Sequence, residues 1–186
     1  SIKKIGVKPF TIPGLSMEML WCKPVTFEMG SPESEKERSL SETQHAVTQK
    51  GYWLGKHEVT QAQWKAVMSN NPSHFTGVDL PVEWVSWNDA TVFCKKLTER
   101  ERKAGRLSPA GYTYQLPTEA QWEYACRAGT TTVFAFGDSL SSKQANFNGT
   151  EPYGGATKGP SVRNTVAVGS YQPNAWGFYD MHGNVW

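Results

Sequence analysis

Short apolar runs separated by polar, glycine-containing stretches mark the first third of the chain. Residues 19–21 and 25–27 combine aliphatic, β-branched and aromatic side chains over a strand-like length, and a turn sequence follows at residues 30–32. Residues 45–48 and 52–55 form a second set of the same kind. Because β-branched and aromatic residues in runs of this length favour strands, the pattern predicts two strand pairs, one within each set.

Three helices are predicted by a common start signal. Thr60 and Thr118 each stand three residues before a glutamine, and Ser86 stands three residues before an aspartate. The hydroxyl can accept from the N–H of the third helical residue, whose side chain can reach back to the N–H of the capping residue. The similar stretches TQAQW and TEAQW are therefore helix starts and not a repeat, because their flanks share no pattern. The predicted helices cover residues 61–68, 87–103 and 119–127.

The second half of the chain has a different character. Glycine, asparagine, proline and serine dominate from residue 129 to residue 173, so regular helix is not expected there. Aromatic residues nevertheless interrupt this stretch, which argues for packing and against disorder. They are Phe134, Phe136, Phe147 and Tyr153. We therefore predict an α+β fold with little regular secondary structure, in a single domain over residues 1–186. Because the chain ends at Trp186 without a polar tail, we expect this fold to be incomplete at the C-terminus.

Charge and hydropathy argue against two classes of partner. The net charge is +2 at pH 7, and lysine and arginine are interspersed with aspartate and glutamate. A basic face for nucleic acid is therefore not predicted. In addition, no apolar run approaches the ~18 residues that a membrane-spanning helix needs.

The three cysteines show none of the close spacings that mark zinc or redox sites. Cys94 and Cys126 fall on predicted helices among apolar neighbours, where a small buried side chain is the expected state. A disulfide between these two cysteines is an open alternative. The histidines are scattered, and His57 with Glu58 lacks the second histidine of a zinc-protease helix.

Five segments in unbroken order resemble the formylglycine-generating enzyme family, also called the sulfatase-modifying factors. Each segment is modest alone, but together they are specific and span nearly the whole chain. The resemblance implies an α+β domain of the C-type-lectin-like type. The matching segments are FEMGS at residues 27–31, GKHEVTQ at 55–61, LPVEWVSW at 80–87, LPTEAQWEYA at 116–125 and GFYDMHGNVW at 177–186.

Active members of this family, the resemblance implies, use copper and O₂ to oxidise a sulfatase cysteine to formylglycine. Two cysteines hold the copper in their C-terminal third, beyond the segment that matches residues 177–186. Cys22, Cys94 and Cys126 lie in other segments, so no catalytic residue of the family is carried over. A copper cofactor is therefore expected only if a C-terminal segment that is missing here carries the cysteine pair.

The link between the first two predicted helices favours another use of this scaffold. Formylglycine generators carry a long insertion there, whereas this chain crosses directly from Met68 to Leu80. The short link resembles bacterial relatives without proven oxidase activity. Among them are the variable proteins of diversity-generating retroelements, which bind ligands through a hypervariable C-terminal surface.

We therefore expect the scaffold of a ligand-binding, C-type-lectin-like protein, exported or on the surface of a bacterial cell. The sequence does not specify whether its ligand is a protein or a small molecule. Most of the binding surface would lie on the segment after residue 186. A truncated copper-dependent oxidase acting on a sulfatase cysteine is the alternative.

One calcium loop of the family resembles the end of this chain. Asp180 would supply a carboxylate, and Gly183 and Val185 would supply backbone carbonyls. Hard oxygen ligands of this kind suit Ca²⁺. The resemblance implies a further glutamate directly after Trp186. Taken without the resemblance, the same residues predict a turn.

A second calcium segment begins, in the family, with a side-chain oxygen followed by a backbone carbonyl. Asn146 and Phe147 match these two positions. The acidic partner is expected near residues 159–161, where no acidic residue stands. For this segment the residues favour a turn, with calcium as the alternative that the resemblance implies.

Overall fold

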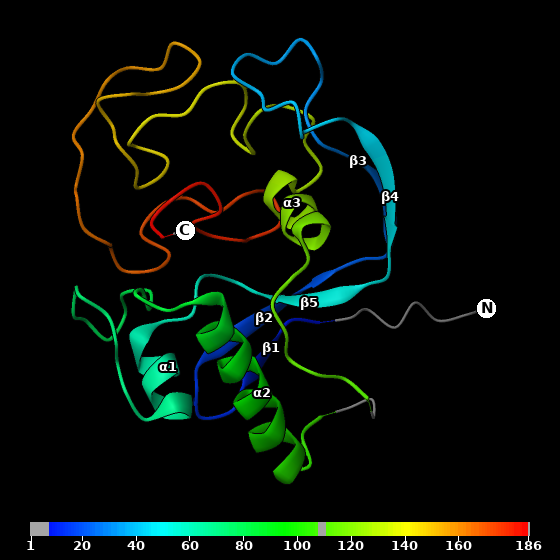
Figure 1. Ribbon diagram of the computed structural model, residues 1–186, viewed down its shortest axis with the longest axis vertical. Helices are drawn as coiled ribbons and strands as arrows, with labels where there is room; N and C mark the ends of the chain where they lie inside the picture. The colour runs from blue at the N-terminus through cyan, green and yellow to red at the C-terminus, as the bar shows by residue number, and fades with distance from the viewer. Residues whose placement is uncertain (1–7, 108–110, 186) are drawn as a thin grey trace.

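A three-stranded antiparallel sheet crosses the middle of the molecule and separates its helices (Figure 1). The computed structural model describes residues 8–107 and 111–185. The sheet is formed, in spatial order, by β1 (Phe10–Ile12), β2 (Met17–Cys22) and β5 (Tyr52–Gly55). It therefore joins the start of the chain to the segment that leads into the first helix.

Three helices lie on the two sides of this sheet. Figure 1 shows α1 (Gln61–Met68) and α2 (Trp87–Lys103) together on one side, and α3 (Glu119–Arg127) on the other. The rings of Trp64 in α1 and Phe93 in α2 stack almost in parallel, with centroids 5.2 Å apart. The α1 and α2 pair thus closes over one face of the sheet.

The two faces of the sheet build two hydrophobic cores. Side chains alternate along a strand, so Met17 and Met19 of β2 point toward α1 and α2, whereas Leu20 and Cys22 point toward α3. The first core contains Ile12, Leu15, Met17, Met19, Trp64, Val82, Phe93 and Leu97. The second core contains Cys22, Tyr124, Ala125 and Phe178. Phe178 lies far along the chain, so the irregular second half packs into the same body.

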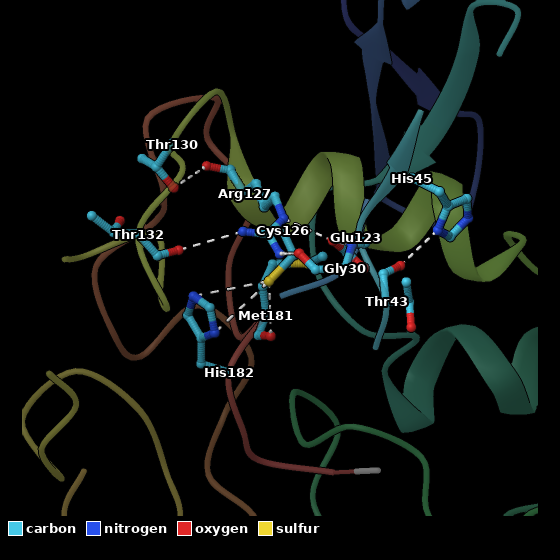
Figure 2. Close-up of polar contacts among 10 residues, drawn as sticks. All are labelled: Gly30, Thr43, His45, Glu123, Cys126, Arg127, Thr130, Thr132, Met181 and His182. Carbon is cyan, nitrogen blue, oxygen red and sulfur yellow. Dashed lines mark hydrogen bonds and ion pairs between the residues drawn. The ribbon is translucent and has the colours of Figure 1, made fainter. Parts of the chain in front are cut away.

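A second, two-stranded sheet pairs β3 (Val25–Met29) with β4 (His45–Gln49). An ion pair between Glu123 and Arg127 of α3 also binds the backbone of Gly30, directly after β3 (Figure 2). Glu123 accepts hydrogen bonds from the Gly30 N–H at 2.9 Å and from Arg127 Nε at 2.8 Å. Arg127 in turn donates to the Gly30 carbonyl at 2.8 Å. This closed set of bonds fixes α3 against the sheet.

All three predicted capping boxes are confirmed. Thr60, Ser86 and Thr118 have extended backbone, and each hydroxyl accepts from the N–H three residues ahead. The side chain of that third residue returns a hydrogen bond to the cap N–H in every case. The helices accordingly begin where the sequence places them.

The predicted strands are present, but their predicted pairing is wrong. β2 pairs with β1 and β5, and β3 pairs with β4, so neither predicted pair forms. Only Lys23 and Pro24 separate β2 from β3, and this link lacks the residues of a tight hairpin turn. β2 instead pairs through one edge with β1, just before it in the chain, and through the other edge with β5, and helices cover its two faces.

Beyond α3, the described residues 130–185 contain isolated bridges but no helix or extended strand. The predicted aromatic packing is present: Phe134 meets the rings of Tyr153 and His182 edge to face, at 5.3 and 5.4 Å. The fold is thus mixed α+β with small sheets and little regular structure, as predicted. Over the described residues no helix is long and apolar enough to span a membrane.

Candidate functional site

A cleft of about 840 Å³ opens between the end of β5, helix α3 and the C-terminal loop. Four segments line it: the end of β5 with His57 and Glu58, then Trp122, residues 146–148 and residues 179–185. Trp122 projects from α3 with 45% of its surface exposed. The cleft therefore combines an accessible aromatic side chain with a polar loop.

The C-terminal loop approaches the segment around Asn146 too closely for any side chain at Gly183. A Cβ atom at Gly183 would lie 2.5 Å from the Asn146 carbonyl oxygen. The Asn184 N–H donates to that same carbonyl at 2.9 Å. Asp180 and Asn184 both have positive φ, +57° and +102°, which aspartate and asparagine tolerate better than most residues. The loop is thus shaped by these three positions.

Asn184 is the polar centre of this loop. Its Oδ1 accepts from the Val166 N–H at 2.9 Å and from Asn146 Nδ2 at 3.1 Å. Its Nδ2 donates to the Val166 carbonyl at 3.2 Å and to Glu58 Oε2 at 3.1 Å. One amide therefore links the β5–α1 connection, residues 146–148 and the end of the chain.

Two half-buried carboxyl groups, those of Asp180 and Glu58, lie beside Asn184, and each has one buried oxygen. Asp180 Oδ2 accepts from the Gly169 N–H at 2.7 Å, but Asp180 Oδ1 has no hydrogen-bond partner among the described residues. Glu58 Oε1 has none there either. Burial, and then the charge of Asp180, raise the pKa of Glu58 to about 8, and burial raises the pKa of Asp180. With a pKa of about 8, Glu58 holds its proton at neutral pH unless a bound cation displaces it, so the site offers two carboxyl oxygens that a cation can bind.

The structure brings all five predicted calcium positions, Asp180, Gly183, Val185, Asn146 and Phe147, to this one cleft. Asn146 is already engaged, since its carbonyl binds the C-terminal loop and its amide group also donates to the Asn164 carbonyl at 2.8 Å. Among the residues that the structure describes, no three His, Cys, Asp or Glu side chains gather into a metal cluster. A cation here would therefore rely on the two carboxyl groups and on backbone carbonyls. That donor set, hard oxygens with net negative charge, fits Ca²⁺.

Sequence reasoning missed Glu58 and Asn184. Glu58 belongs to the family-like segment at residues 55–61 and Asn184 to the one at residues 177–186, but sequence reasoning assigns no role to either side chain. The available signal was the position of Glu58 between the apolar run of β5 and the helix cap at Thr60, where a charge is unexpected. Its partial burial beside a residue more than a hundred positions away is a tertiary property, so the local pattern could not show it.

Cys126 and His182 lie together but cannot act as a thiolate and an imidazolium at neutral pH (Figure 2). The Cys126 sulfur is 3.5 Å from the Met181 carbonyl and 3.8 Å from His182 Nδ1. Burial raises the pKa of Cys126 to about 12 and lowers the pKa of His182 to about 4. His182 Nε2 accepts from the Ala135 N–H at 3.2 Å, as a neutral ring can. The pair is therefore neutral and structural.

The described thiols do not fit the copper site that the family implies. Cys22, Cys94 and Cys126 are all free, so the alternative Cys94–Cys126 disulfide is absent. Cys22 belongs to the second core, whereas Cys94 packs against the first core on the opposite face of the sheet. Burial raises the pKa of Cys22 to about 11 and also raises the pKa of Cys94. Copper binds thiolates, and these surroundings hold all three groups as thiols.

The fold and the cleft define a small α+β domain of irregular structure with a glycine- and asparagine-shaped C-terminal loop. Residues 13–186 match the family described as Sulfatase-modifying factor enzyme 1-like domain, and the chain belongs to this family.

Three similar proteins illustrate the range of this family. The chain is 33% identical over 172 residues to "Chaperone protein LppX" of Paenibacillus barcinonensis, covering 75% of this chain and 61% of that protein. It is 32% identical over 155 residues to the "Formylglycine-generating enzyme" of Bos taurus, covering 81% of this chain and 36% of the enzyme. The solved structure of "Treponema denticola variable protein 1" superposes with a TM-score of 0.74 at 27% identity, covering 96% of this chain and 74% of the other. The chain thus spans roughly a third to three fifths of the length of these two curated relatives.

Proposed function

We propose that this chain is a ligand-binding scaffold with C-type-lectin-like topology, and that its ligand enters the cleft beside Trp122 and the C-terminal loop. Calcium held by Asp180 and Glu58, with the carbonyls of Gly183 and Val185, keeps that loop in place. In this proposal the binding surface continues onto the segment that follows GNVW in the relatives.

The observation that carries the proposal is the pair of buried, unpartnered carboxyl oxygens on Asp180 and Glu58 at the wall of an open cleft. Leaving buried carboxyl oxygens without a partner is costly, and a bound cation removes that cost. The cation would neutralise the site and order the loop, and an ordered loop beside an exposed tryptophan suits recognition. The likeness to the Treponema variable protein supports the same use of the scaffold.

The alternative is the formylglycine-generating oxidase activity, favoured by the 32% identity to the bovine enzyme. The three described cysteines argue against this oxidase activity within the chain, because copper binds thiolates and burial keeps each of these thiols protonated. Incubation of the chain with copper, O₂ and a sulfatase-derived cysteine peptide should therefore yield no formylglycine by mass spectrometry. Formation of the aldehyde would favour the oxidase and overturn the binding proposal.

The proposed ligand binding in the cleft is tested by screening the immobilised chain against peptide and glycan libraries in the presence of calcium. We expect ligands whose retention is lost in Trp122→Ala and reduced by a chelator. Tyr112→Ala is the matched control, since Tyr112 is exposed to a similar extent, 43%, but lies outside the cleft. If no retained ligand depends on Trp122, binding does not involve the cleft and the proposal is contradicted.

A further inference from the structure

A buried glutamine fixes the loop between α1 and α2. Gln61, the first residue of α1, is only 3% exposed. Its Nε2 donates to the carbonyls of Phe75 at 2.7 Å and Pro81 at 3.2 Å. Its Oε1 accepts from Asn71 Nδ2 at 2.8 Å and from the Gly77 N–H at 3.1 Å. Four bonds from one side chain hold this short link in a single shape.

The same link holds Trp84 in an unfavourable backbone conformation. Trp84 has φ +59°, which is rare for a bulky residue. The preceding residue, Glu83, is locked on both sides: its N–H donates to Ser73 Oγ at 3.1 Å, and its carboxylate accepts from the Phe75 N–H at 2.8 Å. The Trp84 side chain is nevertheless 78% exposed, so it buries little surface that would compensate for the strain. Strain that a fold maintains in this way points to a use of the side chain.

The exposed indole of Trp84 lies against a neighbouring aromatic ring. The ring of His74 lies nearly parallel to it, with an interplanar angle of 20° and centroids 5.9 Å apart. His74 itself meets Phe75 edge to face at 4.8 Å. Three residues further on, Trp87 is 71% exposed at the start of α2. The loop therefore presents a supported aromatic surface instead of a freely rotating side chain.

The segment that carries Trp84 contains acidic residues and no basic ones, whereas Lys95 and Arg102 lie farther along α2, in a pocket with Trp87. No lysine or arginine occurs between Lys65 and Lys95, whereas Asp79, Glu83 and Asp89 do. Asp79 and Asp89 are exposed to solvent. Carboxylates attract cations from a distance, and the face of a tryptophan ring binds guanidinium or ammonium groups at short range. The two features select the same kind of partner.

We propose that Trp84, His74, Asp79 and Asp89 form a docking surface for a cationic segment of a partner protein, with an arginine or lysine side chain lying over the Trp84 indole. Tryptophan and arginine are both enriched among the residues that dominate protein interfaces. This surface lies outside the cleft proposed above, so it can serve a second partner, and its test does not depend on calcium or on the cleft ligand.

The test uses fluorescence anisotropy with a labelled Gly-Arg-Gly-Arg-Gly peptide and with the same peptide carrying citrulline in place of arginine. Citrulline has nearly the same shape but no charge, so we expect the arginine peptide to bind about fivefold or more tightly. Trp84→Ala should weaken the arginine peptide by a similar factor, and higher salt should weaken it as well. Trp84→Phe, which keeps a ring face, should retain part of the affinity.

Two control variants separate binding from folding. Trp84→Asn suits the positive φ, so its melting temperature should not fall although binding is lost. Tyr112→Ala removes an exposed aromatic side chain outside both this surface and the cleft, and should leave peptide affinity unchanged. Equal binding of the citrulline peptide would show recognition of an uncharged ligand and overturn the proposal. Full affinity in Trp84→Ala, or no binding at millimolar arginine peptide, would overturn it equally.

Discussion

The two halves of this molecule are ordered by different means. Residues 8–107 and 111–128 depend on strand ladders, three capped helices and apolar side chains on both faces of a sheet. Residues 130–185 have almost no ladder, and single amide side chains replace it. Asn174 bonds to four backbone groups: it donates to the carbonyls of Ala125 and Cys126 and accepts from the N–H groups of Trp176 and Phe178. An irregular segment can thus be ordered when a few buried amide side chains form hydrogen bonds with its backbone N–H and C=O groups.

The largest expected effect tests whether the two halves fold as one unit. Phe178 comes from the irregular half but is 1% exposed in the core against β2 and α3. Phe178→Ala should lower the free energy of unfolding by about 4 kcal/mol. Urea denaturation followed by circular dichroism and by tryptophan fluorescence should still give one coincident transition. Two separate transitions would mean that the halves are independent and that the comparison describes two domains.

The pH dependence of stability tests the acidic site at the junction of the halves. The pKa of Glu58 is raised to about 8 in the folded chain, above its unfolded value near 4.5. Its stabilising contribution is therefore complete below about pH 4.5 and is lost as the pH rises through 8, by on the order of a few kcal/mol. Glu58→Gln should flatten this part of the profile in calcium-free buffer. An unchanged slope in the variant would show that another group titrates.

Replacing a buried amide side chain of the irregular half should lower stability more than removing any of the helix caps. Asn174→Ala leaves several buried backbone groups without partners, and we expect a loss of about 2–3 kcal/mol. Asn88→Ala, at an exposed position on α2, is the matched control and should change stability by less than about 0.5 kcal/mol. Equal and small effects at the two positions would refute the role given to Asn174.

The smallest expected effects belong to the capped helices of the first half. Thr60→Ala and Thr118→Ala each remove one side of a capping box, and each should cost about 1 kcal/mol. Urea midpoints of the two variants measure this directly, with Thr60→Ser and Thr118→Ser as controls that keep the hydroxyl. Midpoints equal to that of the parent chain would show that these caps contribute nothing.

The sequence predicted local structure far better than it predicted the site. Capping boxes are local, so the helix starts at Thr60, Ser86 and Thr118 could be found from spacing alone. Strand pairing is not local, and β1 was missed because three residues carry too little pattern to mark a strand. The half-buried position of Glu58 beside Asn184 depends on the whole fold.

The family resemblance, and not the local sequence pattern, identified candidate calcium positions that lie in the cleft. Asp180 and Asn146 lie far apart in the chain, and no spacing rule would have joined them. The family segments nevertheless pointed to both, and the structure brings them to one cleft.

Calorimetric titration with Ca²⁺ at neutral pH tests the central proposal most directly. We expect one ion per chain, with an affinity that Asp180→Asn abolishes and that Asp138→Asn, a carboxylate outside the cleft, leaves unchanged. Binding should also raise the free energy of unfolding, by about 2.7 kcal/mol when the free calcium is a hundred times Kd. The absence of any heat and of any thermal stabilisation at millimolar calcium, or a calcium response that survives Asp180→Asn, would contradict a calcium-ordered binding cleft.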